Sequence, residues 1–171
     1  MRTAKLCSLI CACALGACAA AAPAPSAVPS VLDPPAGEKR AFAWSGRGVQ
    51  IYVCKASGAT NAQATEAELF DAAGARVGTH GAGPFWQHLD GSKVIGTLKQ
   101  RSDAPASGAV PWLLLSAKSA GGPGTLAAVT SVQRINTGGG SAPAQGCSAA
   151  ADAGARARVP YTAEYVFFVS P

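Results

Sequence analysis

Apolar and polar residues alternate in short segments along most of the chain, and no long window repeats with the period of a helix. The segment 48–54 (GVQIYVC) places three branched apolar residues on one face and Gln50, Tyr52 and Cys54 on the other, as a half-buried strand does. Further segments of this kind follow, separated by Gly, Pro and Asp. The pattern therefore predicts an all-β protein and disfavours a helical bundle.

Turn residues predict two hairpins. Residues 67–71 (AELFD) and 76–79 (RVGT) flank an Ala-Ala-Gly turn, although 62–70 also fits a short helix. Residues 85–89 (FWQHL) and 93–99 (KVIGTLK) flank Asp-Gly-Ser, and Asp-Gly favours a hairpin because glycine adopts positive φ without strain.

The C-terminal half contains three longer apolar segments. Residues 109–117 (AVPWLLLSA) are apolar on both faces, which predicts a central strand covered from both sides. Residues 126–136 (LAAVTSVQRIN) are β-branched without clean alternation, which favours a strand with a bulge. Residues 161–169 (YTAEYVFFV) give a final aromatic strand. About eight strands with regular turn signals predict a single β-sandwich or open barrel.

The N-terminus has the layout of an export signal. Two basic residues precede an apolar segment over 6–15, which is too short to cross a bilayer of about 30 Å as a helix. The next residues, Leu15-Gly16-Ala17-Cys18, resemble the bacterial lipobox, in which the cysteine thiol receives a lipid. The alternative is an ordinary signal peptide cleaved at an Ala-x-Ala site, such as 20–22, with a soluble periplasmic or secreted product.

The lipobox predicts three parts of the chain. Residues 1–17 are the expected signal peptide, 18–36 a lipidated N-terminus and Pro/Ala-rich spacer, and 37–171 the all-β domain. Because the residue after Cys18 is not Asp, we expect outer-membrane attachment facing the periplasm, provided that the host has two membranes. The membrane, reached through the lipid anchor, is then the first expected partner.

Two cysteines remain in the domain, Cys54 and Cys147. An even pair in an exported protein predicts a disulfide. It would close a loop of roughly 90 residues, for which chain entropy gives about 4 to 5 kcal/mol of stabilisation. The alternative is a reactive or metal-binding pair, but no Cys-x-x-Cys is present and neither cysteine adjoins a histidine.

The charge of the chain points to no nucleic acid. The sequence has 14 basic and 9 acidic residues, and two of the basic ones lie in the predicted signal peptide, which leaves a net charge of +3. The basic residues are scattered, whereas a nucleic-acid or anionic-membrane patch requires clustering. No nucleotide cofactor is expected either, because Gly46-x-Gly48 opens a strand and lacks the third glycine of a dinucleotide site.

Several motifs in one order resemble a family of exported bacterial and fungal proteins that is known only as a domain of unknown function. The motifs are GVQIYVC at 48–54, AELFD at 67–71, VGTHGAGPFWQHLDGSKVIG at 77–96, VPWLLL at 110–115, SVQRINTGGGSAP at 131–143 and VPYTAEYVFF at 159–168. The resemblance covers nearly all of the chain after the spacer. It implies an exported all-β domain with paired cysteines, and it implies no activity and no cofactor.

Two polar clusters are candidate sites. His80, His88 and Asp90 could supply a two-histidine, one-carboxylate metal site, although Asp90 is also needed by the turn. A second set, Trp86, Gln87, Arg134 and Asn136, could line a ligand site for an envelope glycan or protein, with Trp86 expected to be partly exposed.

Each candidate has a structural alternative. Arg134, if buried, would need a carboxylate partner, for which Glu164 is the candidate, and Trp86 could simply close one end of the fold. Because no catalytic motif rises above these alternatives, the sequence favours a non-catalytic binding or structural role. The alternative is a hydrolase or metal-dependent enzyme that uses the hairpin from His80 to Lys93.

Overall fold

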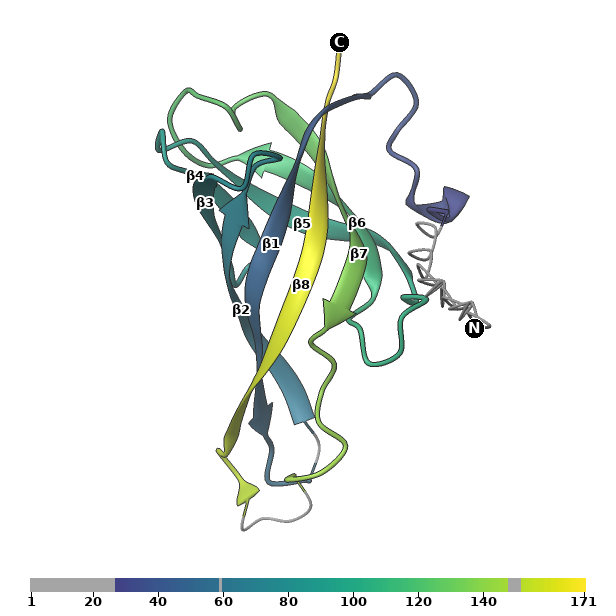
Figure 1. Cartoon of the computed structure of the whole chain (residues 1–171), viewed down its shortest axis with the longest axis vertical. Coiled ribbons are helices and arrows are strands. Elements are labelled where there is room, and N and C mark those ends of the chain that lie inside the picture. Colours follow the sequence, from purple (N-terminus) through teal and green to yellow (C-terminus); the bar gives the residue numbers. More distant parts are fainter. Residues whose placement is uncertain (1–26, 59, 148–151) are drawn as a thin grey trace, which may run out of the picture.

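The computed structural model describes residues 27–58, 60–147 and 152–171, and its strands form one closed barrel (Figure 1). The eight strands are β1 (Lys39–Cys54), β2 (Thr60–Phe70), β3 (Arg76–Gly81), β4 (Phe85–His88), β5 (Lys93–Ser102), β6 (Trp112–Ser119), β7 (Val129–Gly139) and β8 (Arg156–Val169). Consecutive strands pair antiparallel, and β8 pairs with β1 to close the sheet. The all-β prediction is confirmed, and of the architectures expected the barrel is the one formed, with its sheet closed.

Both predicted hairpins are confirmed. Gly74 and Gly91 lie in the turns with φ of 81° and 88°, a region that glycine occupies without strain. The helical alternative for residues 62–70 is wrong, because these residues belong to β2. The bulge expected in the 126–136 segment is also present, since the pairing of β7 with β8 shifts register twice and Asn136 adopts a φ of 49°.

The closing pair, β1 with β8, is longer than the sequence pattern indicated. It runs from Lys39 opposite Val169 to Val53 opposite Arg156. The glycines of β1 weaken its alternation, yet the barrel requires them. A Cβ at Gly46, for example, would lie 2.6 Å from the ring of Tyr165.

Aromatic side chains fill the interior of the barrel. Trp86, Tyr165 and Phe167 are at most 1% exposed. The Trp86 ring lies 5.5 Å from that of Tyr165 and 6.2 Å from that of Phe167, both edge-on. Trp44 extends this cluster, with its ring 4.8 Å from Phe167. The interior is therefore a packed core.

A segment before β1, residues 27–36, covers part of the outer face of β6–β8, and we call it the strap. It contains a 3-10 turn, η1 (Ser30–Leu32), which lies beside β6 and β7 in Figure 1. Leu32 is fully buried against a cluster of outward-facing apolar residues of β6–β8. The buried Gln133 side chain donates a hydrogen bond from Nε2 to the Leu32 carbonyl oxygen at 2.5 Å. The apolar segment 109–117 is thus covered from both sides, as predicted.

The predicted disulfide is confirmed. Cys54, the last residue of β1, is bonded to Cys147 in the segment between β7 and β8, with a Cα–Cα distance of 5.3 Å across 93 residues of sequence. The bond ties the end of β1 to the segment that leads from β7 to β8. The lipobox and Cys18 lie outside the described residues. Within the described part of the chain, no helix has the length and apolar character needed to span a membrane.

Candidate functional site

An open groove of about 590 Å³ lies on the outer face of β1–β4. The register explains which side chains line it, because Val49 lies opposite Glu66 and Arg47 opposite Glu68 on the same face of the sheet. The floor consists of small or apolar residues, namely Gly48, Val49, Ala64, Gly81, Ala82 and Phe85. Gly81 must lack a side chain, since a Cβ there would collide with the Phe85 ring. The close packing of Gly81 against Phe85 therefore excludes a larger side chain at this point of the groove floor.

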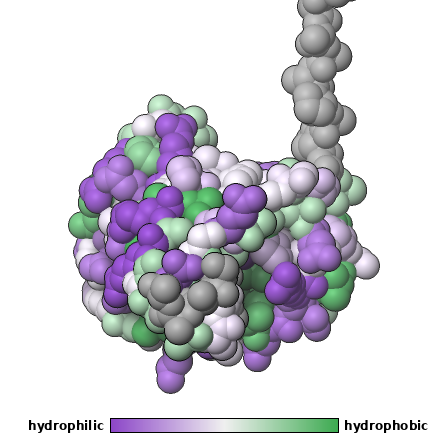
Figure 2. Space-filling model, turned by 90° about the horizontal axis from the view of Figure 1, so that it is seen from below, coloured by the Kyte–Doolittle hydropathy of each residue, from purple (hydrophilic) through white to green (hydrophobic). Residues whose placement is uncertain are grey.

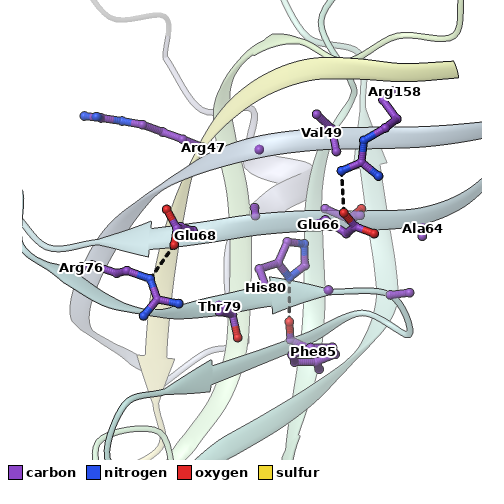
Figure 3. Close-up of a pocket in the computed structure, with 15 residues that line it drawn as sticks. Arg47, Val49, Ala64, Glu66, Glu68, Arg76, Thr79, His80, Phe85 and Arg158 are labelled. Carbon is purple, nitrogen blue, oxygen red and sulfur yellow. Dashed lines mark hydrogen bonds and ion pairs between the residues drawn. The ribbon is translucent and has the colours of Figure 1, made fainter.

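Two ion pairs flank this floor. Arg158 Nη2 lies 2.6 Å from Glu66 Oε2, and Arg76 Nε lies 2.6 Å from Glu68 Oε1. Figure 3 shows one pair on each side of His80. The hydrogen bond and charge of Arg158 lower the pKa of Glu66 below its ordinary value. The rim thus presents ionised carboxylates and guanidinium groups in defined positions.

Arg47 marks the boundary between this groove and a second hollow. Its guanidinium lies 5.0 Å over the Phe70 ring, a cation–π contact. It extends away from the centre of the groove (Figure 3), and it also lines an open hollow of about 750 Å³ beside Phe42 and Trp44. Three arginines and two glutamates therefore surround the groove, which leaves an excess of one positive charge.

His80 lies beneath the groove and points into the core. It is 4% exposed, and its ring stacks on Trp86 at 4.7 Å between centroids. Nδ1 is 2.7 Å from the carbonyl oxygen of Phe85. Burial lowers the pKa of His80 to about 4, against the raising effect of the Phe85 carbonyl. The imidazole is therefore neutral at pH 7, and its Nδ1 carries the proton donated to Phe85.

The proposed metal ligands do not converge. His80 is directed into the core, whereas His88 Nδ1 is 2.9 Å from Asp90 Oδ2 in the turn. Asp90 also accepts hydrogen bonds from the backbone and hydroxyl groups of both Ser92 and Thr125, which hold its pKa well below the usual range. In residues 27–58, 60–147 and 152–171, no group of three His, Cys, Asp or Glu side chains could hold a metal. Asp90 instead fixes the turn to the Thr125 loop.

The second candidate set is divided between the two sides of the barrel wall. Trp86 is 1% exposed, so the expectation of a partly exposed indole is wrong. Alternation along β4 places Trp86 inside and leaves Gln87 exposed. Asn136 is exposed and donates a hydrogen bond from Nδ2 to Glu164 Oε2 at 2.8 Å. The four residues therefore form no common ligand site.

Arg134 is largely enclosed by the barrel, but the expected pair with Glu164 is absent. Glu164 lies on the outer face, where it contacts Asn136 and Arg40. Arg134 donates from Nε and Nη2 to the Pro111 carbonyl oxygen at 3.1 and 2.8 Å, and it also bonds the Tyr165 hydroxyl. Burial lowers its pKa from the ordinary value, although several tyrosines oppose that shift. The partners of the Arg134 guanidinium are therefore an uncharged carbonyl oxygen and an uncharged hydroxyl group, in place of the expected carboxylate.

Among the residues that line the groove, the sequence singled out His80 as a candidate metal ligand, but it assigned none of the glutamates and arginines to a binding site. Alternation in residues 66–70 (EAELF) does place Glu66 and Glu68 on one face, which was an available signal. Their arginine partners gave none, because Arg158 is 92 residues away from Glu66 and reaches it only across β1.

Residues 35–169 match the family described as "Protein of unknown function (DUF3455)". The chain belongs to this family. The match spans the whole barrel from before β1 to the end of β8. It confirms the suspected resemblance to a domain of unknown function. No curated protein and no solved structure matches the chain.

Proposed function

We propose that this protein is a lipid-anchored envelope protein whose barrel binds a saccharide, without catalysis, in the groove on the outer face of β1–β4. The observation that carries the binding role is the pair of ion pairs, Glu66 with Arg158 and Glu68 with Arg76, on either side of an apolar floor. Ligand sites are typically concave and mostly apolar, with a few fixed polar groups that orient the ligand.

The chemistry of the rim favours a saccharide over an extended peptide. Each Glu–Arg pair presents acceptors and donors side by side, which suits the hydroxyl groups of a sugar. Phe85 adds an apolar surface at one end of the groove. A peptide that binds by strand addition needs a free strand edge. Along the groove, β1, β2, β3 and β4 are already paired with one another. The excess positive charge further favours a saccharide that carries carboxylate groups.

The binding proposal is tested by calorimetric titration of the domain with muramidase-solubilised peptidoglycan, a carboxylate-bearing envelope saccharide. The variant Ala82→Trp, which fills one side of the groove, should weaken binding at least about tenfold, equivalent to about 1.4 kcal/mol. The matched control is Arg101→Ala, which breaks the exposed ion pair between Arg101 and Asp103 on β5 and the loop after it. No binding by the wild type, or equal binding by both variants, would refute the saccharide role.

The anchor is proposed from the lipobox Leu15-Gly16-Ala17-Cys18. Cells that express the full chain should incorporate radiolabelled palmitate into it, and the variant Cys18→Ala should lose the label and leave the membrane fraction. Cys7→Ala, within the predicted signal peptide, is the matched control. If Cys18→Ala keeps both the label and the fractionation of the wild type, the ordinary signal-peptide alternative replaces this proposal.

A further inference from the structure

We infer that the barrel lies on an anionic lipid surface with the outer face of β5 and β6 against the headgroups, so that the middle of the groove on β1–β4 faces away. This inference rests on the proposed lipid anchor at Cys18. The surface concerned, which we call the β5 patch, consists of Val31, Lys93, Ile95, Lys99 and Lys118.

The β5 patch combines exposed apolar and basic side chains. Val31 and Ile95 are 48% and 43% exposed, which is high for large apolar residues. Ile95 lies opposite Lys118 across the pairing of β5 with β6. Val31, on the strap, lines the same hollow as Lys99. Apolar residues interleaved with lysines are the composition that binds at the headgroup boundary of an anionic membrane.

The fold gathers charges that are scattered in the sequence. Lys93 and Lys99 come from β5, Lys118 comes from β6, and Lys93 Nζ lies 4.2 Å over the Phe85 ring. The acidic groups nearby are Asp33, which lines the hollow with Lys99, and Asp103, which pairs with Arg101 at 3.6 Å. Counting Arg101, four basic groups face two acidic ones. The sequence therefore predicted no patch for an anionic membrane, because these lysines come together only when β5 pairs with β6.

The length of the tether requires one side of the barrel to be near the membrane. Val28, which packs against the cluster under the strap, is ten residues after Cys18. Ten residues span at most about 35 Å when fully extended. The 16 residues of β1 span about 50 Å along the strand, or about 40 Å along the axis of a barrel whose strands tilt by about 40°, so the tether is no longer than the barrel itself. The tether therefore keeps the barrel close to the lipid surface, and the charge of the β5 patch selects the side that makes contact.

The order of the strands then determines where the groove points. In the closed order from β1 to β8, β2 is four strands from β6 in either direction. The middle of the groove is thus on the opposite side of the barrel from β6. In Figure 2, hydrophilic and hydrophobic residues are intermixed over the end of the barrel that is seen from below, so that end offers no uniformly apolar alternative for membrane contact.

Lysine footprinting of the full mature protein tests this orientation. The protein is labelled with an acylating reagent in detergent and again in phosphatidylglycerol-containing vesicles, and each lysine is quantified by peptide mass spectrometry. Acylation of Lys93, Lys99 and Lys118 should fall at least about threefold in vesicles, because a buried headgroup contact excludes the reagent. Lys55, which is exposed just after β1, is the internal control and should be unchanged.

The variant Lys99→Glu/Lys118→Glu should reduce the protection of Lys93, while Lys39→Glu/Lys55→Glu should not. Equal labelling of all lysines in vesicles and detergent would overturn the orientation. The mass of the N-terminal peptide separates this outcome from failure of the anchor. If Cys18 carries no lipid or has been removed with the signal peptide, the variant Ala24→Cys, coupled to a maleimide lipid, supplies the tether, and the same footprint still decides the orientation.

Discussion

The outer faces of β5–β8 and of β1–β4 belong to the same barrel, yet the first is partly covered by the strap and the second carries an open groove. On β5–β8 the outward positions include Trp112, Leu114 and Phe168, and the strap covers them with Leu32. On β1–β4 the outward positions include paired arginines and glutamates, and an open groove remains. The aromatic interior is common to both. The difference shows that the outward residues decide which part of the wall joins the core and which part is left to bind.

The largest effect should come from removing the main contact of the covered face. Leu32→Ala should lower the free energy of unfolding by about 4 kcal/mol, since Leu32 is fully buried and its loss leaves a cavity. Chemical denaturation measures this change. Val31→Ala, next in sequence and 48% exposed, is the control and should stay within about 0.5 kcal/mol. Equal effects of the two substitutions would mean that the strap does not belong to the core.

Acid should weaken the open side through the histidine beneath its groove. The pKa of His80 is lowered from 6.5 to about 4 by burial, so the unfolded chain binds a proton more readily than the folded one. The stability from this group is complete above pH 6.5 and falls as the pH drops towards 4. The loss approaches about 3 kcal/mol.

Denaturation of wild type and His80→Gln between pH 7 and 4 isolates that contribution. The variant is less stable at pH 7, but its stability should fall less steeply, because the titrating imidazole is gone. The control Gln87→Ala, at an exposed position of the same strand β4, should keep the slope of the wild type. A His80→Gln slope that equals the wild-type slope would show that another group carries the acid sensitivity.

The smallest stability change should come from the rim of the groove. The Arg76–Glu68 pair has side chains 43% and 55% exposed, and surface ion pairs contribute about 0 to 1 kcal/mol. Arg76→Ala should therefore leave the melting temperature almost unchanged while weakening saccharide binding. Arg101→Ala, the control on the exposed face of β5, should change neither quantity. Strong destabilisation by Arg76→Ala would reassign this pair to a structural role.

The sequence predicted the fold well because its signals are local. Alternation and turn glycines identified the hairpins around Gly74 and Gly91, and the even pair of cysteines after a predicted export signal predicted the Cys54–Cys147 bond. Trp86 was misjudged because its polar neighbours, rather than its position between the outward Phe85 and Gln87, guided the interpretation.

The site was harder to predict, because its parts meet only through register. Glu66 and Arg158 become neighbours across β1, and no local pattern contains both. The buried Arg134 was identified as needing partners, but the partners are a carbonyl and a tyrosine, which carry no charge signal in the sequence.

The pairing of β1 with β8 has a consequence for how the molecule forms. Lys39 and Val169 are opposite one another although 130 residues separate them, so the seam of the barrel has the largest loop-closure entropy of any strand pair. Proteins dominated by such distant contacts fold slowly. We therefore expect the barrel to stay open until β8 can pair with β1, so that a chain interrupted before β8 remains incompletely folded and accessible to proteases.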